Sequence, residues 1–121
     1  MAKSILIVED DEQLRRLYCR ALGNAGYPLT LASGTKEALR LLAAGSFDLV
    51  ITDYELGDGT GAELIETARA AGAGCGDVIM VTGSVEKSEL EELAERYRLK
   101  ACFSKPFSVS ELLESVIKAL S

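Results

Sequence analysis

The stretch Ser4-Ile5-Leu6-Ile7-Val8-Glu9-Asp10-Asp11 joins an unbroken apolar run to three consecutive acids. A continuous apolar run of this length is typical of a strand buried on both faces of a parallel sheet. The pattern recurs at Phe47-Asp48-Leu49-Val50-Ile51-Thr52, which leads directly into Asp53. Similar short runs lie further along the chain. The sequence therefore predicts strands at residues 4–8, 28–32, 47–52, 78–82 and 101–104.

Between these runs, apolar residues recur at steps of three and four, the spacing of one face of an α-helix. This spacing predicts helices over about 12–25, 36–44 and 62–71, a fourth helix around 90–97, and a last helix opened by Ser108. Asp11 is expected to cap the first helix, and Ser108 with Glu111 forms a capping box for the last. The residues expected to face inward are Leu14, Leu17, Tyr18, Ala21, Leu22 and Ala25 in the first helix, and Leu112, Leu113, Val116, Ile117 and Leu120 in the last. Residues 57–61 are predicted to be a glycine-rich loop in which Gly59 and Gly61 serve turn geometry.

Strand and helix thus alternate about five times, which predicts an α/β fold with a parallel sheet and helices on both faces. At 121 residues, the chain is expected to form one domain over residues 1–121. Sheets of this kind bind ligands at the carboxyl ends of their strands. The side chains at those ends are therefore the candidates for function.

The composition excludes several kinds of site. A net charge of −6 disfavours direct nucleic-acid binding, and three scattered cysteines, Cys19, Cys75 and Cys102, lack the spacing of a thiolate metal site. No apolar run approaches the ~20 residues that cross a bilayer, so we expect a cytoplasmic protein without membrane contact. The chain contains no histidine, which removes the commonest general base.

Charged and hydroxyl side chains follow four of the predicted strands. Glu9-Asp10-Asp11 follows the first strand, Asp53 the third, Thr82 ends the fourth and Lys105 follows the fifth. Carboxylates held close together repel one another unless a cation lies among them. Oxygen ligands of this kind suit a hard divalent cation, Mg²⁺ or Mn²⁺.

We expect Asp10 and Asp53 to be direct metal ligands and Glu9 to act through water. Asp53 is the candidate nucleophile toward phosphorus. Lys105 would neutralise phosphoryl oxygens, and the Thr82 hydroxyl would donate a hydrogen bond to one of them. Simpler interpretations remain open: the first acids as a helix N-terminal charge cluster, Thr82 as a plain strand-end residue, and Lys105 as a solvated one.

The chain resembles response regulator receiver domains of the CheY-like kind. The resemblance lies in Ile5–Asp11, in Asp48–Asp53, in Val81-Thr82-Gly83 and in Lys105-Pro106-Phe107. It implies a flavodoxin-like, doubly wound, five-stranded sheet of order 2-1-3-4-5 and a cis bond between Lys105 and Pro106. The family's functional positions fall here on Glu9 and Asp10 (acidic pair), Asp53 (phosphoacceptor), Glu55 (metal-binding backbone carbonyl), Thr82 (switch hydroxyl) and Lys105 (phosphate-binding lysine).

The same resemblance implies a role in a two-component phosphorelay. Asp53 would take phosphate from a histidine kinase or a histidine phosphotransfer protein, and the change would be passed to a downstream protein target. The expected output surface is the fourth helix, last strand and last helix, in a monomer or a phosphorylation-dependent dimer. No enzymatic turnover is expected beyond self-catalysed phosphoryl acceptance and slow autodephosphorylation. Glu55 and Ser84 would tune the lifetime of the phosphate.

Two positions depart from the family's pattern. Gly57 stands where many relatives have proline, which predicts a looser loop after Asp53. Cys102 stands where relatives usually have the Tyr or Phe that rotates with the switch hydroxyl. Phe103 is not expected to replace it, because neighbouring strand residues point to opposite faces.

Three other functions are alternatives for this sequence. A flavodoxin-like FMN binder needs phosphate-holding hydroxyls and N–H groups after the first strand, where this chain has acids. A metal-dependent aspartate phosphatase usually carries a second acid two residues after the nucleophile, and Glu55 occupies that position. A degenerate receiver would serve only as a binding module and would not be phosphorylated.

Overall fold

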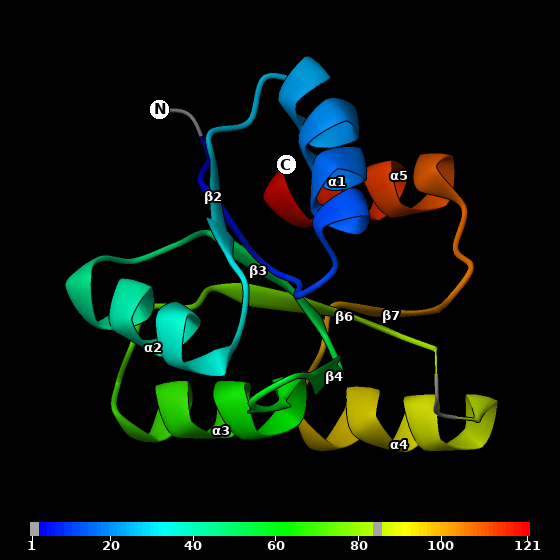
Figure 1. The fold of residues 1–121 in the computed structure, drawn as a ribbon. Helices are drawn as coiled ribbons and strands as arrows, with labels where there is room; N and C mark the ends of the chain where they lie inside the picture. Colours follow the sequence, from blue (N-terminus) through cyan, green and yellow to red (C-terminus); the bar gives the residue numbers. More distant parts are fainter. Residues whose placement is uncertain (1–2, 84–85) are drawn as a thin grey trace.

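The computed structural model describes residues 3–83 and 86–121. Five strands form one parallel sheet in the order β2-β1-β3-β6-β7, which confirms the predicted doubly wound order 2-1-3-4-5 (Figure 1). The strand order reverses at β1, where ligands bind in such folds. The strands are β1 (Ile5–Val8), β2 (Leu29–Ala32), β3 (Leu49–Asp53), β6 (Asp77–Thr82) and β7 (Ala101–Ser104).

Helices cover both faces of the sheet. In Figure 1, α1 and α5 lie above the sheet, and α2, α3 and α4 lie below it. Their bounds are α1 (Glu12–Asn24), α2 (Thr35–Ala44), α3 (Gly61–Ala70), α4 (Lys87–Arg96) and α5 (Val109–Leu120). No helix in the described part of the chain is both long enough and apolar enough to cross a membrane.

Side-chain alternation along the central strands divides the interior into two apolar cores. Leu49 and Ile51 in β3 face α1 and α5, where they meet Tyr18 and Val116. Val50, between them in the sequence, faces the other core with side chains of α2 and α3. A strand that feeds both cores must be apolar at every position, which explains the continuous runs in the sequence.

The helix ends confirm the predicted caps. The Asp11 carboxylate accepts hydrogen bonds from the backbone N–H groups of Gln13 (2.9 Å) and Leu14 (3.4 Å). The Ser108 hydroxyl accepts one from the backbone N–H of Glu111 at 3.3 Å. Each cap satisfies N–H groups that have no partner within the helix.

Two predicted inward-facing residues are wrong. Ile117 is 47% exposed, because the buried stripe of α5 follows steps of four through Leu112, Val116 and Leu120, and Ile117 lies beside that stripe. Ala25 is exposed because α1 ends at Asn24, which leaves Ala25 as the cap residue.

The prediction of a plain loop at residues 57–61 is also wrong. Glu55–Leu56 (β4) pairs antiparallel with Gly59–Thr60 (β5), so a short hairpin follows the main strand β3. Gly61, the first residue of α3, has more than a turn role. A Cβ atom there would lie 2.2 Å from the backbone oxygen of Asp53, so only glycine lets the hairpin close on β3.

Candidate functional site

Four strands bring their ends to one edge of the sheet and place the predicted residues there. Glu9 directly follows β1, Asp53 is the last residue of β3, Thr82 is the last of β6, and Lys105 directly follows β7. Because all four strands are parallel, these ends lie at the same edge. The structure therefore brings these four residues to one edge of the sheet, as predicted.

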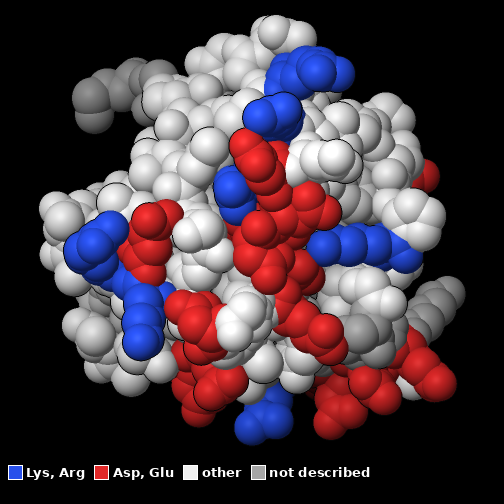
Figure 2. Space-filling model, viewed as in Figure 1, with Lys and Arg blue, Asp and Glu red and all other residues white. Residues whose placement is uncertain are grey.

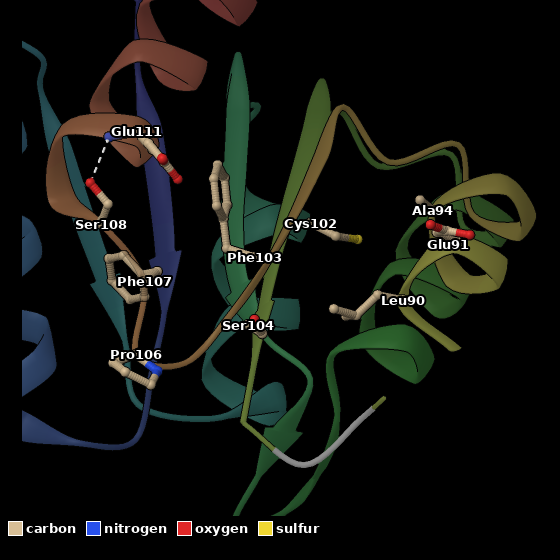
Figure 3. A pocket seen from close by; sticks show the side chains of 10 residues that line it. All are labelled: Leu90, Glu91, Ala94, Cys102, Phe103, Ser104, Pro106, Phe107, Ser108 and Glu111. Atoms are coloured by element: carbon tan, nitrogen blue, oxygen red, sulfur yellow. Dashed lines mark hydrogen bonds between the residues drawn. The ribbon is translucent and has the colours of Figure 1, made fainter. Parts of the chain in front are cut away.

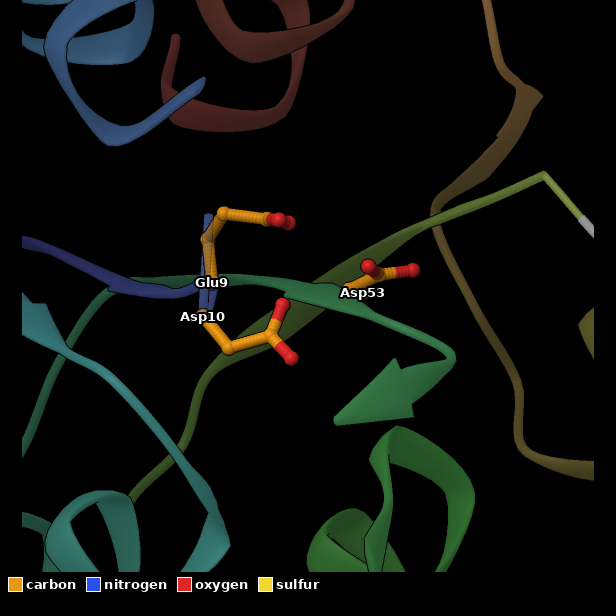
Figure 4. A group of neighbouring side chains, drawn as sticks. All are labelled: Glu9, Asp10 and Asp53. Carbon is orange, nitrogen blue, oxygen red and sulfur yellow. The ribbon is translucent and has the colours of Figure 1, made fainter. Parts of the chain in front are cut away.

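Three carboxylates share the centre of this edge. One carboxylate oxygen from each of Glu9, Asp10 and Asp53 lies within 4.8 Å of the others. Figure 4 shows the three carboxylates near the ends of β1 and β3, with the Glu9 and Asp10 side chains extending toward the side of Asp53. Glu9 and Asp53 are buried, at 1% and 6% exposure, whereas Asp10 is exposed. The site is therefore open to solvent on the side of Asp10.

Lys105 supplies the positive charge of the site. Its ammonium nitrogen Nζ lies 2.8 Å from Asp53 Oδ2, within hydrogen-bond distance, and 3.6 Å from Glu9 Oε1. Partial burial lowers the pKa of Lys105, but the hydrogen bond to Asp53 and the negative charges of Glu9 and Asp53 outweigh that effect. The pKa is therefore raised overall, and the side chain stays an ammonium.

The surroundings of Glu9 compensate its negative charge poorly. Burial, followed by the nearby charge of Asp53, raises the pKa of Glu9 to about 7. Its Oε1 accepts a hydrogen bond from the backbone N–H of Asp11 at 3.3 Å, but its buried Oε2 has no hydrogen-bond partner among the described residues. A buried carboxylate oxygen without a partner is costly unless a cation or proton satisfies it.

The donor set fits a hard divalent cation. Three carboxylates against one ammonium leave an excess of negative charge, and the ligands are all oxygen, as Mg²⁺ and Mn²⁺ prefer. The orphaned Glu9 Oε2 points to the same need. Figure 2 shows acidic side chains in a band down the middle of this face of the molecule, with basic side chains beside it.

Thr82 lies beside the cluster. It is fully buried, and its backbone oxygen accepts a hydrogen bond from the Lys105 N–H at 2.8 Å. The preceding residue, Val81, pairs with Asp53 in the sheet. Thr82 and Lys105 are thus held at the end of the strands next to Asp53. Ser84, the second residue expected to tune phosphate lifetime, lies outside the described residues.

The hairpin brings Glu55 and Gly57 to the same edge. Glu55 pairs with Thr60 in β5, and the base of the hairpin is fixed because Tyr54 N–H donates to Val81 O at 2.9 Å. A Cβ atom on Gly57 would lie 3.9 Å from Asp10 Oδ2. The turn therefore borders the carboxylate cluster.

Arg15 is a residue of the site that the sequence did not predict. Its guanidinium donates a hydrogen bond from Nη1 to the backbone oxygen of Glu9 at 2.6 Å. The bond ties the first turns of α1 to the strand end that carries the acidic pair. Six residues separate the two, and no periodic pattern relates a strand end to the following helix, so the sequence carried no signal for this contact.

The family comparison agrees with this geometry. The model of the response regulator receiver domain matches residues 5–117. The chain belongs to the response regulator receiver domain family.

Relatives of this receiver domain have different lengths. Chemotaxis protein CheY of Pseudomonas aeruginosa is 31% identical, and the match covers 94% of this chain and 93% of that protein. The swarming motility regulation protein RssB of Serratia marcescens is 35% identical over 93% of this chain, which spans only 51% of RssB. A CheY-like receiver domain structure from Methanospirillum hungatei JF-1 is 30% identical, with a TM-score of 0.87 over 99% of this chain and 94% of that one.

Cys102 lines a pocket in this receiver domain. Figure 3 shows Cys102 on the side of α4, near Leu90 and Ala94, and Phe103 on the opposite side, near Phe107. Phe103 packs against the core beneath α1 and α5, so the prediction that neighbouring residues face opposite sides is confirmed. Both Cys102 and Phe103 line a cavity of about 530 Å³ between α4 and the start of α5.

The remaining expectations at the site have clear outcomes. The bond between Lys105 and Pro106 is cis, as the resemblance implied. All three cysteines are free, and burial raises the pKa of the Cys102 thiol, which favours its protonated form. The family match gives no support to the flavin-binding and phosphatase alternatives.

Proposed function

We propose that Asp53 accepts a phosphoryl group from a phosphorylated protein partner, with the help of a divalent cation, and that this modification switches the chain's protein interactions. The observation that carries the proposal is that Asp53 lies next to the Lys105 ammonium and within 4.8 Å of carboxylate oxygens of Glu9 and Asp10. A carboxylate nucleophile flanked by a cation and by metal-binding oxygens is suited to receive a phosphoryl group.

Asp53 attacks the phosphorus through a carboxylate oxygen. An oxygen–phosphorus bond forms, the phosphorus–nitrogen bond of the donor's phosphohistidine breaks, and the bonding electron pair returns to the donor's imidazole nitrogen. The buried position of Asp53 at a strand end holds its carboxylate in place before the reaction, which lowers the entropic cost of reaching the reactive geometry. The product is an acyl phosphate on Asp53.

Lys105 and Thr82 stabilise the transferred group. The Lys105 ammonium, already 2.8 Å from Asp53 Oδ2, pairs with a phosphoryl oxygen when Asp53 is modified. The Thr82 hydroxyl donates a hydrogen bond to a second phosphoryl oxygen.

Glu9, Asp10, Asp53 and the backbone carbonyl of Glu55 would hold the cation, Mg²⁺ or Mn²⁺. When bound, the cation supplies neutralisation of the phosphoryl charge. The orphaned oxygen of Glu9 supports its place in the ligand shell, directly or through water.

The phosphate donor is a separate protein or a small acyl phosphate, because this chain has no histidine. Receiver domains interact with histidine kinases, and one relative is named Sensor histidine kinase RcsC, from Salmonella typhi, which is 29% identical over 93% of this chain. We propose a histidine kinase or histidine phosphotransfer protein as donor, and a downstream protein target that binds α4, β7 and α5. Four further expectations stay predictions: a cytoplasmic location, no direct nucleic-acid binding, no membrane contact, and a monomer or a phosphorylation-dependent dimer.

The chain is proposed not to be an enzyme that turns over substrates. Autophosphorylation is a single modification of Asp53, followed by slow hydrolysis of the acyl phosphate. Repeated turnover of small phosphomonoesters would instead favour the phosphatase alternative, whereas slow loss of a single phosphate from Asp53 would not.

Acetyl phosphate tests the proposal without a partner protein. With Mg²⁺, the wild-type protein should gain one phosphoryl group by intact mass, and Asp53→Asn should gain none. Asp48→Asn is the matched control, because Asp48 is an exposed acid directly before β3, at the end of the strand opposite to Asp53. Wild-type protein that gains no phosphate from acetyl phosphate or from any histidine kinase tried would support the degenerate receiver instead.

A further inference from the structure

Asp58 joins two parts of the chain that are distant in sequence. It lies in the turn between β4 and β5, and its carboxylate accepts hydrogen bonds from the first backbone N–H groups of α2, those of Thr35 (2.8 Å) and Lys36 (3.1 Å). The Thr35 hydroxyl donates to the backbone oxygen of Asp58 at 3.4 Å. We call this set of contacts between Asp58, Thr35 and Lys36 the hairpin clasp.

The start of α2 depends on the clasp. Gly34 is the cap residue of α2, and no side chain of its own satisfies the first N–H groups of the helix. The Asp58 carboxylate, from 23 residues further along the chain, satisfies them instead. These hydrogen bonds lower the pKa of Asp58, which keeps the group a carboxylate. A Cβ atom on Gly34 would lie 2.8 Å from Asp58 Oδ1, so a larger residue there would displace the carboxylate.

The clasp holds the tip of a hairpin whose other side borders the carboxylate cluster. Gly57, next to Asp58, lies against Asp10, since a Cβ atom there would be 3.9 Å from Asp10 Oδ2. The base of the hairpin is fixed separately, by Tyr54 N–H to Val81 O and by Gly61 N–H to Tyr54 O. Among the contacts of the described residues, those of the hairpin clasp hold the tip of the hairpin in place.

We propose that Asp58 is a positioning residue for cation binding: the hairpin clasp holds the turn at Gly57 against Asp10 and thereby keeps the Glu55 backbone carbonyl in place as a metal ligand. In this chain Gly57 has none of the backbone restriction that a proline would bring, so the clasp supplies the restraint from outside the turn. The inference rests on the proposed function, because it assumes that the carboxylate cluster binds a divalent cation.

Two variants break the clasp in different ways. Asp58→Ala removes the carboxylate, and Gly34→Ala keeps it but pushes it away from the N–H groups of α2. Both should weaken Mg²⁺ binding, measured by isothermal titration calorimetry, by roughly tenfold, the lower end of what loss of a supporting hydrogen bond costs a metal site. Because Asp58→Ala also removes a negative charge, Gly34→Ala separates positioning from simple electrostatics.

The matched control is Asp48→Ala. Asp48 also accepts a backbone N–H across a long sequence separation, from Ser4 at 2.8 Å, but at the far edge of the sheet. It should lower stability without changing Mg²⁺ affinity. With acetyl phosphate, both clasp variants should need more Mg²⁺ for half-maximal phosphorylation but reach a maximal rate close to wild type once Mg²⁺ is saturating.

The outcomes separate the two proposals. Wild-type protein that binds no Mg²⁺ would defeat the proposed function itself. A wild-type protein that binds Mg²⁺, with Gly34→Ala equal to it in affinity, would overturn the positioning role of Asp58. A reduced maximal rate at saturating Mg²⁺, or an equal loss of affinity in Asp48→Ala, would assign the effect to general destabilisation and would overturn it as well.

Discussion

The ammonium nitrogen of Lys105 lies 2.8 Å from Asp53 Oδ2, although 52 residues separate the two in the sequence. One lysine therefore neutralises the proposed phosphoacceptor and, at 3.6 Å, also pairs with Glu9. The Lys105 ammonium that pairs with Asp53 before the reaction can therefore pair with the phosphoryl group after it.

Replacing this lysine tests its part in phosphoryl acceptance. Lys105→Ala should slow phosphorylation by acetyl phosphate at saturating Mg²⁺ by about tenfold to a hundredfold, since a hydrogen bond to a charged group contributes about 1.5–3 kcal/mol. Lys100→Ala, an exposed lysine before β7, is the control and should react at the wild-type rate. Equal rates for Lys105→Ala and wild type would show that the ammonium takes no part.

Glu9 predicts a pH dependence of stability in metal-free buffer. Its pKa rises from an ordinary 4.5 to about 7 in the folded protein, so folding favours its neutral form. The stabilisation is fully present below about pH 4.5 and is lost as the pH rises through 7. Over that window, the free energy of unfolding of the wild type should fall relative to Glu9→Gln by up to about 3 kcal/mol.

Urea denaturation of the wild type and of Glu9→Gln, between roughly pH 5 and pH 8, measures this difference in the free energy of unfolding. Glu114→Gln, which changes an exposed glutamate of α5, should follow the wild type. Added Mg²⁺ should reduce the difference, because a cation stabilises the ionised form of Glu9. A difference between wild type and Glu9→Gln that does not change with pH would contradict the raised pKa.

Gly61, which directly follows the hairpin, is predicted to tolerate replacement poorly. Gly61→Ala would place a Cβ atom 2.2 Å from the Asp53 backbone oxygen and should destabilise the fold by about 1–3 kcal/mol, the usual cost of overpacking. Gly45→Ala is the matched control, since no atom lies within 4 Å of its added Cβ and its backbone is extended. Chemical denaturation measures the free energy of unfolding of both variants. Equal values for Gly61→Ala and Gly45→Ala would contradict the close approach of Gly61 to the Asp53 backbone.

Cys102 borders a cavity that should accept an aromatic ring. Cys102→Tyr is expected to change the free energy of unfolding by less than about 1.5 kcal/mol, because the ring can enter the space between α4 and α5. Cys75→Tyr, at a cysteine that is 4% exposed within the packed core, should cost considerably more. Denaturation midpoints that are equally low for both variants would show that the cavity is closed to an added ring.

The fold could be predicted because its central strands are buried on both faces. Continuous apolar runs such as Ile5–Val8 are typical of strands that are buried on both faces of a sheet. Their alternation with helices then predicts that the sheet is parallel. Parallel strands place their carboxyl ends at one edge, so the sequence alone predicts that Asp53 and Lys105 lie close together. The motifs shared with receiver domains supplied the strand order and the assignment of roles.

The hairpin and its clasp could not be predicted in the same way. Strands of two residues, Glu55–Leu56 and Gly59–Thr60, are too short to show alternation, although Gly57-Asp58 between them is a two-residue turn signal that was available. The bonds from Asp58 to α2 join positions 22 and 23 residues apart, and no local pattern encodes them. The prediction that Ile117 is buried was wrong for a different reason. Its neighbour Val116 occupies the buried stripe of α5, and both residues are apolar, so their type alone does not show which one faces the core.

Borohydride trapping tests the central claim most directly. Protein incubated with acetyl phosphate and Mg²⁺ is reduced, which converts a phosphorylated aspartate to homoserine, and tandem mass spectrometry then locates the homoserine. Homoserine is expected at position 53 alone, and none when the cation is removed by chelation. Homoserine at Asp10 or Asp11, or equal labelling at Asp53 without a divalent cation, would contradict it.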